Sequence, residues 1–141
     1  MKIVALDPGE STGWCTKSIE SAQLAAGTLP KDHLQVFLWL QQQKPDLVIC
    51  ESFHLFPGKA QSLSWNSFYP CEVIGIIKLY CMLYSVELVM QAPGVKKYAG
   101  GLQSDWHVLQ QGMLKGHVTE HAKDAYMHLK YFERNGLRSK K

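Results

Sequence analysis

Short apolar runs and helical patterns follow one another in an order that strongly limits the fold. Runs typical of strands come first, at Lys2–Leu6, Thr12–Ser18 and Ala22–Leu29, with only short connections between them. Such connections favour antiparallel neighbours, whereas the later alternation of helices and strands favours parallel pairing. The sequence therefore predicts an α/β fold with a mixed five-stranded sheet and helices on both faces.

The later elements are predicted from their end signals and their periodicity. Asp32 is placed to cap a helix that runs to about Gln43. The expected apolar stripe of that helix is Leu34, Phe37, Leu38 and Leu40. Further strands are expected at Asp46–Glu51 and Glu87–Gln91, a loop at Ser52–Asn66, and helices at Ser67–Ser85, Pro93–Tyr98, Ser104–Leu114 and Thr119–Asn135.

Length and composition exclude several classes of protein. The chain has 141 residues, so we expect residues 1–141 to form a single domain. A hydrophobic share of 46% with only 19% charged residues excludes intrinsic disorder. The longest apolar stretch, Phe68–Ala92, contains three charged side chains, which argues against a membrane span.

The cysteines and the charge distribution add two expectations. Cys15, Cys50, Cys71 and Cys81 form no C-x-x-C pair, and we expect buried free thiols in a reducing cytoplasm. The net charge is only +3, but residues 112–141 carry seven Lys or Arg against three acids. This basic segment can contact phosphates, or it can be a solvated helix face and tail.

Three acids stand where an α/β sheet forms its ligand site. Asp7 directly follows the first strand, Glu51 ends the fourth, and Asp124 lies in the last expected helix. If that helix packs across the strand ends, the carboxylates converge, and they repel one another unless cations neutralise them. Oxygen ligands suit Mg²⁺ or Mn²⁺, and two such ions can promote phosphodiester hydrolysis. Taken alone, Asp7 is more typical of a turn residue, and Glu51 and Asp124 are more typical of solvated positions, so the prediction depends on their combination.

The sequence around these acids resembles the RuvC-type Holliday-junction resolvases. The resemblance is carried, in order, by LDPGESTGW at Leu6–Trp14, VICE at Val48–Glu51, the segment Val95–Met113 and HAKDA at His121–Ala125. It covers nearly the whole chain and looks closest to the compact bacteriophage-type members. The resemblance implies an RNase H-like fold, a homodimer, and metal-dependent cutting of branched DNA in the cytoplasm of a bacterial or phage-infected cell.

The resemblance also assigns residues. Asp7, Glu51 and Asp124 take metal-ligand positions, and Lys96 takes the place of a lysine that supports the scissile phosphate or positions the nucleophile. The family often has a further acid where this chain has His121, which is three residues from Asp124 and can still reach the metal or a water. Imidazole favours Mn²⁺ over Mg²⁺.

Further residues are candidates for DNA contact. Phe53 and Phe56 match the place of a family aromatic that wedges into the junction, although both rings can instead cover the core. A second family lysine falls on His107, which leaves a phosphate contact there in question. The remaining candidates are Lys59, Lys97 and Lys115. The apolar helix at Phe68–Tyr84 is the expected dimer element, with a plain core helix as the alternative.

Three histidines share a helical face with one of the acids. His117, His121, Asp124 and His128 are spaced by four, three and four residues. This stripe is consistent with a metal and proton-transfer face in which His121 is a ligand or general base, with a zinc site, or with ordinary polar face residues.

The favoured function is a structure-selective DNA endonuclease that cuts Holliday junctions and other branched DNA by paired symmetric nicks, with two Mg²⁺ or Mn²⁺ ions per active site. One alternative is a non-catalytic branched-DNA-binding protein, which His121 and His107 motivate. Another is a nuclease for RNA–DNA hybrids or flaps. An actin-like ATPase is set aside because such proteins need two domains of this kind.

Overall fold

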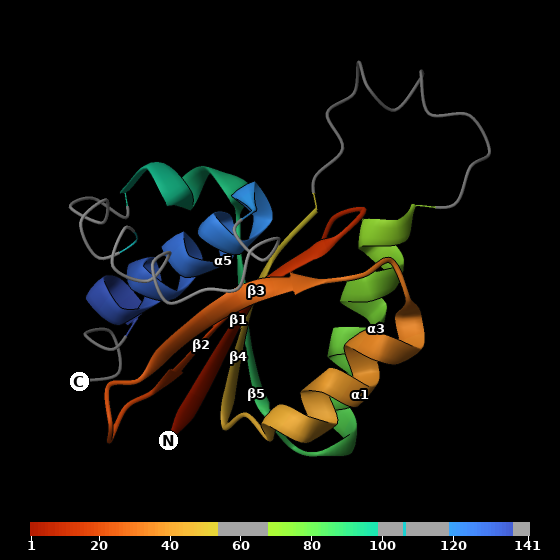
Figure 1. Cartoon of the computed structure of the whole chain (residues 1–141), viewed down its shortest axis with the longest axis horizontal. Helices are drawn as coiled ribbons and strands as arrows, with labels where there is room; N and C mark the ends of the chain where they lie inside the picture. The colour runs from red at the N-terminus through yellow and green to blue at the C-terminus, as the bar shows by residue number, and fades with distance from the viewer. Residues whose placement is uncertain (54–67, 99–105, 107–118, 137–141) are drawn as a thin grey trace.

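The computed structural model describes residues 1–53, 68–98, 106 and 119–136 (Figure 1). Its elements are β1 (Lys2–Asp7), β2 (Thr12–Ser18), β3 (Leu24–Leu29), α1 (His33–Gln43), β4 (Leu47–Glu51), α3 (Tyr69–Leu83), β5 (Glu87–Gln91), the 3₁₀ helix η1 (Pro93–Tyr98), α5 (Glu120–Tyr131) and the π-helical turn η2 (Phe132–Gly136). The expected order of strands and helices is confirmed for the elements that the structure describes. Within these ranges, no helix is both long and apolar enough to cross a membrane.

The strands form one mixed sheet in the order β3-β2-β1-β4-β5. β1 pairs antiparallel with β2, and β2 with β3, which confirms the antiparallel pairing expected from the short connections. β1 pairs parallel with β4, and β4 with β5. Because parallel neighbours end on the same side of a sheet, Asp7 at the end of β1 and Glu51 at the end of β4 lie together.

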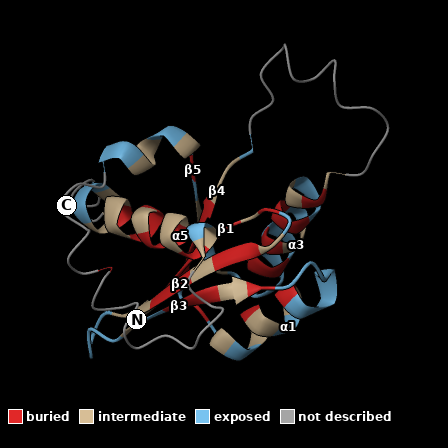
Figure 2. Cartoon of the chain, turned by 45° about the horizontal axis from the view of Figure 1, so that its top comes forward, coloured by how far each residue is buried: buried red, intermediate tan, exposed pale blue. Residues whose placement is uncertain are grey.

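Helices cover both faces of the sheet, with α1 and α3 on one side and α5 on the other (Figure 1). Strand side chains alternate between the two cores, and buried residues run along the strands (Figure 2). Val4 and Leu6 pack with α1 and α3, whereas Ile3 and Ala5 pack with α5. Asp7 continues the register of Ile3 and Ala5, so its side chain lies on the face that α5 covers.

The start of α5 is fixed close to the sheet. Thr119 is the N-cap, its Oγ1 accepting from the backbone N–H of Ala122 at 3.1 Å and lying 2.7 Å from Thr28 Oγ1 of β3. A Cβ added to Gly13 on β2 would lie 2.0 Å from the carbonyl oxygen of His121. Only glycine therefore allows the helix backbone this close to β2, and this approach places His121 and Asp124 over the strand ends.

We expect Gly13→Ala to lower the free energy of unfolding by about 1–3 kcal/mol, because the new methyl group overlaps helix backbone that cannot give way locally. Urea denaturation measures the change. The control is Gly94→Ala in η1, where a Cβ would meet no described atom within 4 Å and the change should stay within about 0.5 kcal/mol. Equal stability of the two variants would contradict the close approach of α5.

The cap of α1 was predicted correctly, but part of its apolar stripe was wrong. Asp32 Oδ1 accepts from the backbone N–H groups of Leu34 and Gln35 at 3.0 and 3.2 Å. The side chains buried against the sheet are Val36 and Leu40. Leu34 and Leu38 are exposed, because residues two positions from Val36 and Leu40 point to the opposite side of a helix.

Two smaller predictions also differ from the structure, and a third is not tested by it. The third strand begins at Leu24, since Ala22 has a φ of 56° in the turn before it. The last helix is α-helical only to Tyr131 and then widens into η2. The expected helix at Ser104–Leu114 lies outside the described residues except for Trp106, which is buried against Tyr126.

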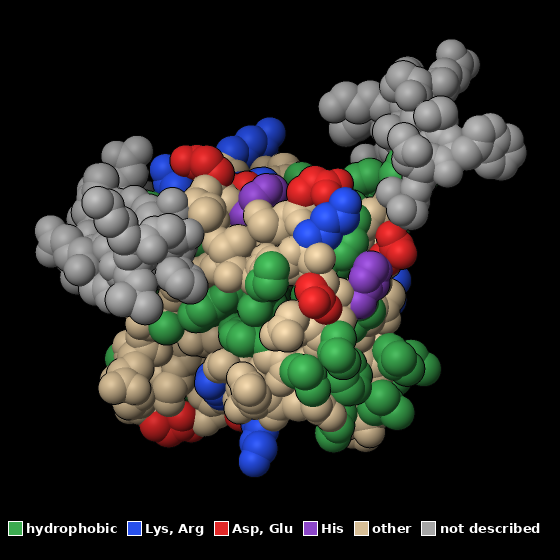
Figure 3. All heavy atoms as spheres, turned by 45° about the vertical axis from the view of Figure 1, so that its right-hand side comes forward, with side chains coloured by type: hydrophobic (Ala, Val, Ile, Leu, Met, Phe, Trp, Pro, Cys, Tyr) green, Lys and Arg blue, Asp and Glu red, His purple; other side chains and the backbone are tan. Residues whose placement is uncertain are grey.

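The helix α3 is buried on one face only. Val73, Ile77 and Tyr80 pack into the core. Cys71 is exposed, which corrects the expectation that all four thiols are buried, because this residue lies on the opposite face of the helix. Apolar side chains gather on the surface formed by α1 and α3 (Figure 3), and they include Leu79 and Met82 at 51% and 78% exposure.

Candidate active site at the strand ends

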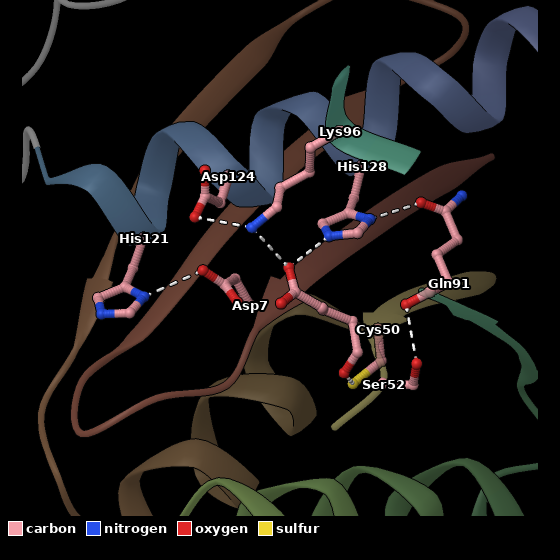
Figure 4. A network of polar contacts seen from close by, with 9 residues as sticks. Asp7, Cys50, Ser52, Gln91, Lys96, His121, Asp124 and His128 are labelled. Atoms are coloured by element: carbon pink, nitrogen blue, oxygen red, sulfur yellow. Dashed lines mark hydrogen bonds and ion pairs between the residues drawn. The ribbon is translucent and has the colours of Figure 1, made fainter. Parts of the chain in front are cut away.

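Three carboxylates meet where α5 crosses the strand ends (Figure 4). Asp7 and Glu51 come from the ends of neighbouring parallel strands, and Asp124 comes from the first turns of α5. The Asp7 side chain is only 6% exposed, and Glu51 and Asp124 are also largely covered. The structure thus brings together the three acids that the sequence singled out.

Lys96 from η1 lies between two of these carboxylates. Its Nζ is 3.2 Å from Glu51 Oε2 and 3.1 Å from Asp124 Oδ2. Burial alone would lower the pKa of Lys96, but the contacts with Asp124 and Glu51 outweigh burial and raise that pKa above its ordinary value. Lys96 is therefore a charged ammonium that offsets part of the negative charge of the cluster.

His121 contacts the third carboxylate. Its Nδ1 lies 3.0 Å from Asp7 Oδ2. A Cβ on Gly9 would come within 2.8 Å of the His121 ring, so this glycine leaves the space that the imidazole occupies. Both glycines of the Asp7–Gly13 segment thus serve the same helix: Gly9 accommodates the His121 side chain and Gly13 its backbone.

The environment of Asp7 disfavours the ionised form of its carboxyl group. Burial, together with the negative charge of Glu51, raises its pKa to about 6, although the hydrogen bond with His121 acts in the opposite direction. A strongly perturbed pKa in a group of converging acids is typical of a functional site. A bound cation would offset the charge of Glu51, which is the second cause of this raised pKa after burial.

Glu51 is hydrogen-bonded to His128, which in turn contacts Gln91. His128 Nε2 lies 2.6 Å from Glu51 Oε2, and His128 Nδ1 lies 2.7 Å from Gln91 Oε1. Burial would raise the pKa of Glu51, but the hydrogen bond from His128 and the charges of His128 and Lys96 outweigh burial and keep that pKa below its ordinary value. The sequence analysis predicted no role for Gln91. The only sequence signal for this residue is its position at the end of β5.

The two described histidines of the stripe therefore contact different carboxylates of the cluster. His121 contacts Asp7, whereas His128 is fully buried against Glu51, so the interpretation of His128 as an ordinary polar face residue was wrong. His117 lies outside the described residues. Among the side chains that the structure describes, no group of three or more His, Cys, Asp or Glu is arranged to hold a metal ion as it stands.

The donor set nevertheless fits a divalent cation by its chemistry. Asp7, Glu51 and Asp124 offer the carboxylate oxygens that Mg²⁺ and Mn²⁺ prefer, and His121 adds a nitrogen that suits Mn²⁺. The pKa of Asp7 is raised mainly by burial and secondly by the negative charge of Glu51, so the neighbouring carboxylates contribute to the shift. Part of this negative charge is compensated by Lys96, between Glu51 and Asp124.

The expected DNA-contacting residues are described only in part. Phe53 follows the end of β4 with a side chain that is 39% exposed, and its ring lies 6.5 Å from that of Phe68. Lys97 is exposed next to the site, with its Nζ 5.0 Å from the ring centre of Tyr98. Phe56, Lys59, His107 and Lys115 lie outside the described residues.

The fold is similar to that of solved RuvC-type resolvases, as the sequence resemblance implied. The structure is similar to Thermus thermophilus RuvC in complex with a Holliday junction substrate, with a TM-score of 0.67, 15% identity, and 96% of each chain covered. A second Thermus thermophilus RuvC structure gives 0.60 and 16%, covering 96% of this chain and 97% of that one.

The likeness extends to a eukaryotic protein. The yeast mitochondrial Holliday junction resolvase Ydc2 aligns with a TM-score of 0.61 and 10% identity, over 94% of this chain and 77% of its own. No protein-family model and no curated protein sequence matches the chain.

Proposed function

We propose that the protein is a metal-dependent, structure-selective endonuclease that cuts Holliday junctions and other branched DNA by paired symmetric nicks, with residues 1–141 as one nuclease domain. The observation that carries this proposal is the meeting of Asp7, Glu51 and Asp124 at the ends of β1 and β4. The fold shared with resolvases, one of them solved with a Holliday junction substrate, supports branched DNA as the substrate.

In the proposed mechanism, Asp7, Glu51 and Asp124 would hold two Mg²⁺ or Mn²⁺ ions together with His121. Such cations supply the Lewis acidity that activates a water and stabilises the leaving oxygen of a phosphodiester. His121 orients Asp7 through its Nδ1. Lys96, whose ammonium lies among the same acids, is placed to stabilise negative charge on the phosphate.

Two described residues are proposed to contact DNA. Phe53 presents a partly exposed ring two positions beyond Glu51, where it can stack on an unpaired base for about 1–3 kcal/mol. Lys97 follows Lys96 in η1 and is exposed, so its ammonium can bind backbone phosphate.

The test is cleavage of a labelled four-way DNA junction, with Mg²⁺ and Mn²⁺ in parallel reactions. Linear duplex, flaps and RNA–DNA hybrids serve as competing substrates. Paired symmetric nicks in the junction alone are the expected result, and faster cutting in Mn²⁺ would point to His121 as a metal ligand. Preferential cutting of hybrids or flaps would replace the proposal with a different nuclease on the same fold.

A second candidate function is a non-catalytic branched-DNA-binding protein. The ion pairs of Lys96 with Glu51 and Asp124 favour it, because they neutralise part of the acidic cluster without any metal. This candidate predicts that the junction binds but stays intact in both metals, so the same experiment separates the two functions.

We further propose a homodimer through α3, within the range Phe68–Tyr84. The outer face of α3 carries Cys71, Gly75, Leu79 and Met82 at about one residue per turn, all of them exposed. A Cβ on Gly75 would meet no described atom within 4 Å, so a second helix can approach closely there. A two-fold dimer would present two identical sites to the two strands that are cut.

Met82→Glu is expected to convert the dimer into a monomer, because it places two buried charges in an apolar two-fold interface. Size-exclusion chromatography with light scattering measures the mass. The control is Ile19→Glu, which adds the same charge at an exposed position in the β2–β3 connection. The assignment of the interface to α3 is wrong if the two variants have the same mass. A monomeric wild type would exclude the homodimer.

A further inference from the structure

A layer of polar contacts behind the proposed metal ligands is not used by the mechanism above. The imidazole of His128 is completely buried on the sheet-facing side of α5. It lies between Glu51 at the end of β4 and Gln91 at the end of β5, within 2.6 and 2.7 Å of their side-chain oxygens (Figure 4). The contact therefore joins one helix to two strands.

Stability alone does not explain a histidine at this position. Ala125 and Leu129, on the same side of α5, belong to the apolar cluster, so an apolar side chain could pack there too. Burying a polar ring costs free energy that its hydrogen bonds only offset, and apolar replacements of such buried contacts are often neutral or stabilising. What the imidazole provides, and a leucine cannot, is a donor aimed at Glu51.

The direction of that hydrogen bond follows from the partners. The Glu51 carboxylate can only accept, so His128 Nε2 carries the hydrogen and donates. The Gln91 amide has both a donor and an acceptor, so it can satisfy Nδ1 whether or not Nδ1 carries a hydrogen. Gln91 thus keeps the ring in the orientation that donates to Glu51.

Gln91 is itself firmly anchored. It is the neighbour of Glu51 in the parallel β4–β5 pairing. Its backbone carbonyl accepts from Ser52 N at 2.8 Å and from Ser52 Oγ at 3.2 Å. The side chain that orients His128 therefore comes from a backbone held at the same strand ends as the carboxylate that His128 contacts.

We propose that His128, held by Gln91, is a positioning residue that fixes the Glu51 carboxylate toward Asp7 and Asp124. This inference rests on the proposed function, since it gives Glu51 the orientation in which it would bind a cation. Residues that orient metal ligands typically change metal affinity or activity by about 10–100-fold when they are replaced.

Two variants of the same residue separate positioning from packing. The amide nitrogen of glutamine reaches close to the place of histidine Nε2, whereas the asparagine amide lies close to the place of Nδ1. His128→Gln therefore keeps a donor for Glu51, and His128→Asn keeps only a partner for Gln91. The readout is Mn²⁺ binding to the DNA-free protein by calorimetry, which needs no cleavage activity.

We expect His128→Asn to bind Mn²⁺ about 10–100-fold more weakly than the wild type and His128→Gln to stay within about threefold of it. Equal affinities of the two variants would overturn the proposal. Thermal unfolding checks that each variant is folded. Should His128→Asn fail to fold, Gln91→Met keeps the volume at position 91 and removes only the anchor, and we expect it to weaken Mn²⁺ binding about 3–10-fold.

A second readout distinguishes failure of this inference from failure of the proposed function. In the metal-free protein labelled with ¹⁵N-histidine, Glu51→Gln should shift the His128 Nε2 resonance, because that nitrogen donates to Glu51. An unchanged resonance would overturn the positioning role. A wild type that binds no Mn²⁺ but shows the shift would overturn the metal-dependent function and leave the positioning of Glu51 in place.

Discussion

Asp7→Asn is expected to abolish cutting of a four-way junction and to leave junction binding intact. Asp7 is the most deeply buried acid of the cluster, so no water easily replaces its oxygen as a ligand. An asparagine at position 7 removes one of the charges that would hold the cations. We expect the cleavage rate to fall at least about 10³-fold, which is about 4 kcal/mol in activation free energy. Single-turnover cleavage measures the loss, and a gel shift in Ca²⁺ measures binding.

The same substitution should raise the stability of the metal-free protein. The pKa of Asp7 is 3.8 in its ordinary state and about 6 in the fold, because of burial and the charge of Glu51. The folded protein therefore binds a proton more readily than the unfolded chain, and stability falls as pH rises from about 4 to about 6. At neutral pH the ionised Asp7 costs on the order of 3 kcal/mol.

Urea denaturation in EDTA tests this expectation. Asp7→Asn should be more stable than the wild type at pH 8, and the difference should shrink toward pH 4, where the wild-type carboxyl is protonated. A variant that cuts poorly and is also less stable at pH 8 would show a folding defect, and the loss of cutting would then say nothing about Asp7 as a ligand. Cutting at the wild-type rate would remove Asp7 from the proposed site.

The sheet was predictable because its strands carry local signals. Lys2–Leu6 and Asp46–Glu51 are short apolar runs that end in turn residues or acids, and they form β1 and β4 with only small changes at their ends. The cap at Asp32 is equally local. The buried side of α1 was less predictable, since this helix has apolar residues on several sides and only packing against the sheet and α3 decides which are buried.

The residues of the site were likewise predictable only where the sequence carries a local signal. Asp7 and Glu51 were found because each ends an apolar strand, and Asp124 because its motif resembles that of resolvases. Gln91 was missed because its role depends on the β4–β5 register and on the position of α5, neither of which has a local signal.

Two histidines of the stripe cannot bind the same metal ion, for a geometric reason. His121 and His128 are seven residues apart, so they are separated by about 10 Å along the helix axis. One metal ion cannot bind both, and α5 instead carries them to two different strands, where they contact Asp7 and Glu51.

Lys96→Met is expected to change metal binding and cutting in opposite directions. In the DNA-free protein, the Lys96 ammonium contacts Glu51 and Asp124, the oxygens that a cation would need, so lysine and metal compete for them. Removing this charge should tighten Mn²⁺ binding about tenfold, equivalent to about 1.4 kcal/mol. Cutting should fall about 10²–10³-fold, because the variant loses the ammonium that stabilises charge on the phosphate.

Lys97→Met is the matched control, since it removes the same charge from the next residue of η1, whose ammonium lies over the Tyr98 ring and not among the acids. Its Mn²⁺ affinity should stay within about twofold of the wild type, and any effect on cutting should appear as weaker junction binding. If Lys96→Met leaves Mn²⁺ affinity unchanged, the ammonium does not compete with the metal. If it cuts at the wild-type rate, Lys96 only neutralises the acids and does not stabilise charge on the phosphate. Tighter Mn²⁺ binding together with slower cutting would instead mean that Lys96 has two roles. It would neutralise the acidic cluster before the metal binds and stabilise charge on the phosphate afterwards.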